Sequence, residues 1–221
     1  MAGITRRDFL RASAWALGGV VVSTGLQGCF VSSSSAEVER SLAFEHGVAS
    51  GDPLSDRIMV WTRVTPKDAS TADVDISWEV ARDAAFTQML HSGSASTGQA
   101  RDFTLKVDVQ NLTPGQSYYY RFKAGSAVSP VGRMTTLPAA GVAQVRFAVL
   151  SCSNFPAGYF HAYAQAAQES ELDAVLHLGD YIYEYATGEY ATEDAAALGR
   201  SLPEDNNGEL FTLGDYRKRY A

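Results

Sequence analysis

Hydrophobic and polar positions alternate along several segments in the first half of the chain. In the clearest segment, every second residue from Val74 to Val80 is apolar and the residues between them are polar. Successive side chains of a β-strand point to opposite faces, so this period of two predicts a strand with one buried face. We predict three further strands, at residues 58–64, 103–109 and 118–122.

Turn-forming residues lie between the predicted strands. They occur at Asp52-Pro53, Thr65-Pro66, Ser92-Gly93 and Thr113-Pro114-Gly115. Pro and Gly favour backbone angles that interrupt regular structure, so we expect the chain to turn at each of them. Short strands at this spacing predict an antiparallel β-sandwich over residues 43–137. The Pro-Gly turn followed by Tyr118 resembles a fibronectin type III domain, where such a tyrosine hydroxyl bonds back to the backbone.

The pattern changes after a predicted linker at residues 141–143. Residues 145–150 form a nearly continuous apolar run, which is typical of a strand buried on both faces. Residues 160–172 are rich in Ala and predict a helix, and residues 174–178 predict a second buried strand. A strand, a helix and a strand in this order predict a β-α-β unit of a parallel sheet.

Chemically useful side chains follow both apolar strands. Cys152 comes just after the first strand, and Asp180 comes just after the second. In open α/β sheets, ligands bind outside the carboxyl ends of the strands. We therefore expect Cys152 and Asp180 to lie side by side at this edge of the sheet.

The composition narrows the choice of partners. Hydrophobic residues make up 46% of the 221 residues and charged residues 19%, which is ordinary for a globular protein with a sizeable core. The net charge is -7, and the basic stripe of a nucleic-acid surface is not apparent in the sequence. An acidic chain can still act on an anionic substrate, because a bound metal reverses the field locally.

The N-terminus resembles a twin-arginine (Tat) export signal. Paired arginines and a Phe-Leu pair lie within residues 5–11, and a weakly hydrophobic run with several glycines follows at residues 12–26. This run is too short and too interrupted to predict a membrane span. The resemblance implies export of the folded protein by the Tat machinery. The alternative is an exposed amphipathic helix.

Two processing routes remain open for this segment. Residues 26–29 resemble a lipobox, in which Cys29 becomes a lipid-modified N-terminus. Small residues at 34–36, at the end of a Ser-rich run, offer a signal-peptidase site instead. We therefore assign residues 1–36 to a signal and tether, and expect a periplasmic, secreted or lipid-anchored protein. In either route Cys29 does not pair with Cys152.

Two motifs in the second half carry a family resemblance. Residues 151–154, Ser-Cys-Ser-Asn, and residues 177–185, His-Leu-Gly-Asp-Tyr-Ile-Tyr-Glu-Tyr, closely resemble the PhoD-type alkaline phosphatases. Residues 46–53 and 60–63 resemble the start of that family's N-terminal domain. The resemblance implies a fibronectin III-like β-sandwich followed by a calcineurin-like α/β metallophosphoesterase domain, of which residues 144–221 are the incomplete start.

The resemblance also implies a binuclear site with Fe(III) and Ca(II). It makes Cys152 the thiolate ligand of iron, Asp180 the carboxylate that bridges both metals and Tyr183 the phenolate ligand of iron. The donor chemistry agrees, because a hard trivalent metal favours anionic oxygen and a thiolate beside a metal loses its proton. Two metals hold the attacking and leaving oxygens of a phosphoryl displacement and acidify a bound water.

Each of these residues also has a structural interpretation. Cys152 has the size and polarity of a buried core residue, Asp180 suits a helix N-cap, and Tyr183 lies in an aromatic-rich loop that favours packing. Strand alternation places His177 on the face opposite Asp180, so we interpret it as a core or supporting group. The other histidines lack ligand spacing and are interpreted as structural: His46, His91 and His161.

Three donors are too few for two metals, so we expect the chain to be the N-terminal part of a longer product that is inactive alone. Residues 188–208 are polar and acidic, and residues 212–215 predict a capping box that opens a last helix. The hypothesis is an exported hydrolase of phosphate mono- and diesters. The alternatives are a phospholipase D-like phosphodiesterase of the same architecture and a non-enzymatic exported β-sandwich binding module.

Overall fold

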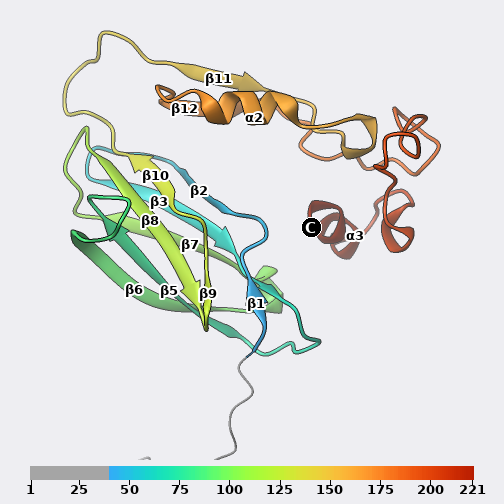
Figure 1. Cartoon of the computed structure of the whole chain (residues 1–221), viewed down its shortest axis with the longest axis horizontal. Helices are drawn as coiled ribbons and strands as arrows, with labels where there is room; N and C mark the ends of the chain where they lie inside the picture. Colours follow the sequence, from blue (N-terminus) through green and yellow to red (C-terminus); the bar gives the residue numbers. More distant parts are fainter. Residues whose placement is uncertain (1–39) are drawn as a thin grey trace, which may run out of the picture. The chain divides into compact units, whose positions relative to one another are not determined.

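The computed structural model describes residues 40–221, and Figure 1 shows their elements along the chain. The predicted export signal, the tether and Cys29 lie outside these residues. Within the part described, no helix has the length and hydrophobicity that a membrane span requires.

The predicted β-sandwich is confirmed, and its two sheets are antiparallel (Figure 1). The first sheet has the order β2 (Val48–Gly51), β3 (Arg57–Arg63) and β7 (Thr104–Gln110). The second has the order β10 (Gly132–Thr135), β8 (Ser117–Ala124), β5 (Val74–Ala81) and β6 (Met89–Thr97), and β9 (Ala127–Val128) pairs with β8. The short strands β1 (Leu42–Ala43) and β4 (Thr65–Pro66) pair with each other, and the 3-10 helix η1 (Gln99–Arg101) precedes β7.

The core of the sandwich follows the period of two in the sequence. In β8, Tyr118, Phe122 and the alternate residues between and after them are buried, whereas the intervening side chains are partly exposed or exposed. The Tyr118 hydroxyl accepts a hydrogen bond from the Thr113 backbone N–H at 2.9 Å. This contact is the predicted return of a tyrosine to the backbone at a strand corner, and it satisfies a hydroxyl that is otherwise buried in the core.

Two of the predicted turns were wrong. Thr65-Pro66 forms β4, and Ser92-Gly93 lies inside β6, where Gly93 pairs with Trp78 of β5. A Cβ on Gly93 would lie 2.7 Å from an atom of the Trp78 ring. Gly93 therefore allows the Trp78 indole to lie close to the neighbouring strand. Close approach of this kind is a common reason for glycine within a sheet, as is a turn or bulge.

The predicted β-α-β unit is present after the sandwich. Strand β11 (Phe147–Leu150) is parallel to β12 (Ala174–His177), and helix α2 (His161–Gln168) lies between them in the sequence. The helix ends four residues earlier than predicted, since Glu169 is already extended. The remaining elements are the 3-10 helices η2 (Phe155–Ala157) and η3 (Glu204–Asn206) and the last helix α3 (Leu213–Tyr220), which opens with the predicted Thr212 capping box.

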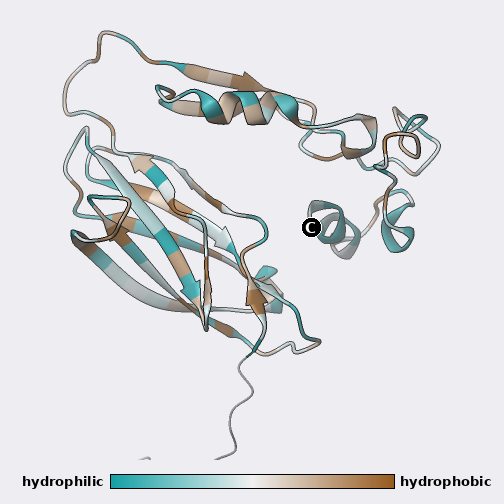
Figure 2. Ribbon diagram, in the orientation of Figure 1, coloured by the Kyte–Doolittle hydropathy of each residue, from teal (hydrophilic) through white to brown (hydrophobic). Residues whose placement is uncertain are grey.

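The apolar strands of this unit were expected to be buried on both faces, and in the described chain they are not. Val149 of β11 and Val175 of β12 are each 56% exposed. Figure 2 shows hydrophobic residues along β11, and these side chains are half-buried or exposed, whereas those of the sandwich core are buried. The parallel pairing holds the two strands together through backbone hydrogen bonds, whereas their side chains lack a covering layer among residues 40–221.

Candidate metal centre

The three predicted ligands lie together in the structure. The Cys152 Sγ is 3.5 Å from the Asp180 Oδ2, and the Tyr183 hydroxyl is 3.2 Å from the same oxygen. Cys152 and Asp180 are exposed and Tyr183 is half-buried. A thiol, a carboxylate and a phenol therefore converge on a point that solvent and small anions can reach.

Backbone hydrogen bonds beyond the two parallel strands produce this convergence. The Cys152 N–H donates to the Gly179 carbonyl at 3.1 Å, and the Ser153 N–H donates to the Asp180 carbonyl at 2.7 Å. These bonds continue the pairing of β11 with β12 past both strand ends. The chain then turns sharply, because Cys152 has φ 64° and Asp180 has φ 53°. Positive φ is strained for residues with a Cβ, and such strain is concentrated at functional sites.

The electrostatics of the cluster favour a bound cation. The hydrogen bond with Cys152, together with burial and the nearby Asp180 carboxylate, raises the pKa of Tyr183 far above its usual range. The Tyr183 phenol therefore keeps its proton and donates it to Asp180 unless a cation lies nearby. Carboxylate and phenolate oxygens suit a hard metal ion, and a neighbouring cation would lower the pKa of the phenol and so favour the phenolate. The donor set thus fits part of the predicted centre.

The donor set is incomplete among residues 40–221. Nowhere in this part of the chain do three or more His, Cys, Asp or Glu side chains gather in a way that could hold a metal ion. The centre seen here therefore consists of two such side chains, Cys152 and Asp180, with the Tyr183 phenol as the third donor.

A second polar cluster supports the two loops that carry these donors. The His177 Nε2 is 2.7 Å from the Tyr163 hydroxyl and 3.0 Å from the Ser153 hydroxyl, which also bond each other. The His177 Nδ1 accepts from the Gly179 N–H at 3.3 Å, so the neutral ring carries its proton on Nε2. His177 therefore links the loop after β11 to the loop after β12. The sequence interpretation as a supporting group agrees with these contacts, but Ser153 and Tyr163 were missed.

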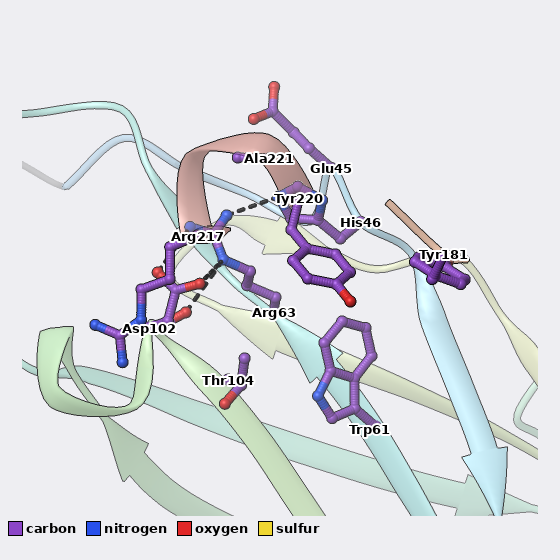
Figure 3. A pocket seen from close by; sticks show the side chains of 10 residues that line it. All are labelled: Glu45, His46, Trp61, Arg63, Asp102, Thr104, Tyr181, Arg217, Tyr220 and Ala221. Carbon is purple, nitrogen blue, oxygen red and sulfur yellow. Dashed lines mark hydrogen bonds and ion pairs between the residues drawn. The ribbon is translucent and has the colours of Figure 1, made fainter. Parts of the chain in front are cut away.

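The contacts of the remaining histidines involve residues other than the three candidate ligands. His46 accepts a hydrogen bond from Arg63 at 2.6 Å, and Arg63 makes a bidentate ion pair with Asp102, as Figure 3 shows. Burial, followed by the charge of Arg63, lowers the pKa of His46. His91 pairs with Val80 in the sandwich, and the His161 ring lies against Tyr159. These contacts fit the structural roles predicted for all three.

Comparison with known proteins gives matches along both parts of the chain. The model of the PhoD-like phosphatase N-terminal domain matches residues 31–138, and the model of the PhoD-like phosphatase matches residues 147–221. Alkaline phosphatase D of Bacillus subtilis (strain 168) is 42% identical over 188 residues, which cover 82% of this chain and 31% of that protein. A solved structure of PhoD superimposes with a TM-score of 0.71 and 42% identity, over 79% of this chain and 34% of that chain.

These matches concern the sandwich and the start of the α/β part together, in the order that the sequence predicts. The chain spans about a third of the length of these relatives. The chain belongs to the PhoD-like phosphatase family.

Proposed function

We propose that the protein to which this chain belongs is an exported alkaline phosphatase, which hydrolyses phosphate mono- and diesters at a binuclear metal site. One observation carries the proposal: the Cys152 thiol, the Asp180 carboxylate and the Tyr183 phenol meet at the ends of two parallel strands. The relative named alkaline phosphatase D supports the reaction type. Iron(III) and calcium(II) are the metals that the family resemblance suggests.

Each donor has a distinct part in this proposal. Cys152 and Tyr183 would hold iron, and the Asp180 carboxylate would serve as a ligand of both iron and calcium. The metals would supply positive charge for the phosphoryl group and a bound water of lowered pKa. The chain's own contribution is geometric, since the turns at Cys152 and Asp180, both at positive φ, aim the two side chains at one point.

Export by the Tat machinery and a lipid anchor at Cys29 are part of the same proposal. They rest on the paired Arg6 and Arg7 and on the Leu-Gln-Gly-Cys sequence. Replacement of both arginines by lysine should leave the protein in the cytoplasm, which fractionation and immunoblotting would measure. Export that is unaffected by this change would contradict the Tat route.

Metal analysis of the complete gene product, combined with hydrolysis of phosphate esters, tests the enzymatic proposal. Asp180→Asn should lower metal content and activity by more than the roughly 10–100-fold typical of a residue that only supports a ligand. Tyr183→Phe should remove a visible phenolate-to-iron charge-transfer band. Asp194→Asn and Tyr185→Phe are matched controls, because they are the same changes at side chains outside the cluster.

The outcomes of this experiment separate the hypotheses. Iron with calcium in the wild type, lost in Asp180→Asn and retained in Asp194→Asn, is the expected result. A wild-type protein that binds no metal contradicts the phosphatase and favours an exported binding module. Metal with activity restricted to phospholipid diesters would favour the phospholipase D-like alternative.

A further inference from the structure

Arg219 on helix α3 has an unusually complete set of hydrogen bonds. Its Nη1 donates to the carbonyls of Tyr183 at 2.7 Å and Tyr185 at 3.4 Å. Its Nε donates to the Asn206 side-chain oxygen at 2.9 Å, and its Nη2 donates to the carbonyls of Asn206 at 2.8 Å and Gly208 at 3.1 Å. All five N–H donors of the guanidinium therefore have an acceptor.

These acceptors differ from the usual partners of an arginine because all of them are neutral. Within residues 40–221, the ion pairs of the chain involve other basic residues, such as Arg121 with Glu79 and Lys218 with Asp205. Burial lowers the pKa of Arg219, so part of its hydration has been exchanged for these carbonyl and amide contacts. A half-buried cation whose N–H donors all bind backbone or amide oxygens is suited to fixing the path of a loop.

The helix that carries Arg219 is itself fixed at its first turn. Thr212 and Asp215 form a reciprocal capping box, and the Asn206 side-chain nitrogen donates to the Asp215 carbonyl at 3.1 Å. Asn206 is buried, with 7% exposure, and it binds both Asp215 and Arg219. Residues four apart lie on one face of a helix, so the face with Asp215 and Arg219 is attached to the loop that contains Asn206.

Arg219 also binds the loop that carries Tyr183, the third candidate ligand. The Tyr183 carbonyl accepts from Arg219, and the Tyr183 hydroxyl lies 3.2 Å from Asp180. Further backbone bonds join the two loops, from Thr187 to Asn207 at 2.8 Å and from Leu210 to Glu184 at 2.9 Å. Arg219 thus connects the peptide of Tyr183 to η3 and α3, which are far away in the sequence.

We propose that Arg219 is a positioning residue, which fixes the backbone of Tyr183 and thereby holds its phenol beside Asp180 for metal binding. This inference rests on the proposed function for the identity of the ligand.

The test compares Arg219→Met with Arg217→Met in the complete gene product. Methionine keeps an unbranched stem and removes all the donors. Arg217 is a matched control, because it lies on the same helix, is also half-buried and donates to two carbonyls of η1, those of Gln99 and Ala100. We expect Arg219→Met to lower iron affinity by about 10–100-fold, the effect of losing a group that orients a ligand. Its phenolate-to-iron band should weaken or shift, and Arg217→Met should resemble the wild type.

Amide hydrogen exchange gives a readout that does not depend on metal. The Thr187 and Leu210 amides should exchange faster in Arg219→Met than in Arg217→Met, since the loops they join are released. Arg219→Lys supplies at most three donors and should fall between wild type and Arg219→Met, and it also serves if the methionine variant does not fold. A lysine variant equal to the wild type in iron affinity and exchange would overturn the proposal.

Two further outcomes distinguish this inference from the proposed function. Iron affinity and absorption that are equal in Arg219→Met and Arg217→Met, with an iron-loaded wild type, would overturn the positioning role and leave the phosphatase proposal intact. A wild type without iron would overturn the phosphatase proposal, and with it the metal-binding purpose assigned to Arg219.

Discussion

The β-sandwich and the β11–α3 region keep their shape by different means. The sandwich surrounds an apolar core in which Phe122 and Ile76 have no exposed surface, and its backbone follows regular strands. The β11–α3 region leaves Val149 and Val175 uncovered, and polar contacts at Ser153 and Arg219 join its loops in addition to a few buried apolar residues such as Leu210. The difference separates a structural module from the part of the chain where chemistry is expected.

Removal of a large apolar side chain should show the largest contrast between the two regions. Phe122→Ala removes a fully buried ring from the sandwich and should lower the free energy of unfolding by about 3–5 kcal/mol. Phe147→Ala, on the 52% exposed ring of β11, should change it by no more than about 0.5 kcal/mol in this chain. Chemical denaturation followed by far-ultraviolet circular dichroism, which reports on the backbone of both regions, measures both. Equal losses would show that β11 is covered in solution and would contradict the contrast.

Removal of one tyrosine hydroxyl from each region gives a smaller and sharper comparison. Tyr118→Phe removes a buried hydroxyl and leaves the Thr113 N–H without its partner in a part-buried contact, and it should cost about 1–3 kcal/mol. Tyr163→Phe should cost about 0.5–1.5 kcal/mol, because Ser153 and His177 remain 3.0 Å apart and still bond each other. The same denaturation experiment compares the two variants. A larger loss for Tyr163→Phe would mean that the polar cluster is the more important support.

The two regions also differ in how far the sequence predicts them. The sandwich strands are predictable because alternation has one cause, the burial of one face; β8 shows it along its whole length, and β5 shows it up to the irregularity between Val80 and Ala81. Strand β6 was missed because its small residues, including Gly93, make room for Trp78 instead of forming an apolar stripe. Contact with a particular neighbour leaves no periodic signal in the sequence.

The candidate centre also combines residues that the sequence predicts with residues that it does not. Cys152 and Asp180 were predicted as neighbours because parallel strands bring their carboxyl ends to one edge, and the family motif added Tyr183. Arg219 gave no such signal, since its partners are mostly backbone carbonyls, which every residue type carries. The sequence therefore predicts the donors better than the contacts that aim them.

The smallest expected effect concerns pH and a polar contact on the sandwich. The His46 Nε2 must be unprotonated to accept from Arg63, and burial and the Arg63 charge lower the pKa of His46 below the ordinary histidine value of 6.5. The carboxylates of Glu45 and Asp102 oppose this shift, and Lys67, the weakest of these influences, acts in the same direction as Arg63. Between the lowered folded pKa and 6.5 the unfolded chain binds more protons, so stability rises with pH in this window.

The contact between His46 and Arg63 should therefore make its full contribution to the free energy of unfolding above pH 6.5. This contribution should be lost as the pH falls through the lowered pKa of His46. His46→Gln removes the titrating group and should flatten this dependence, while His161→Gln, at an exposed ring, should retain it. Thermal unfolding between about pH 5 and 8, where histidine is the side chain whose unperturbed charge changes, measures the slope. The effect should be modest because His46 is only partly buried and solvent screens its interaction with Arg63. A slope that persists in His46→Gln would assign the acid sensitivity to another group and would leave the Arg63 contact without influence on the stability of the sandwich.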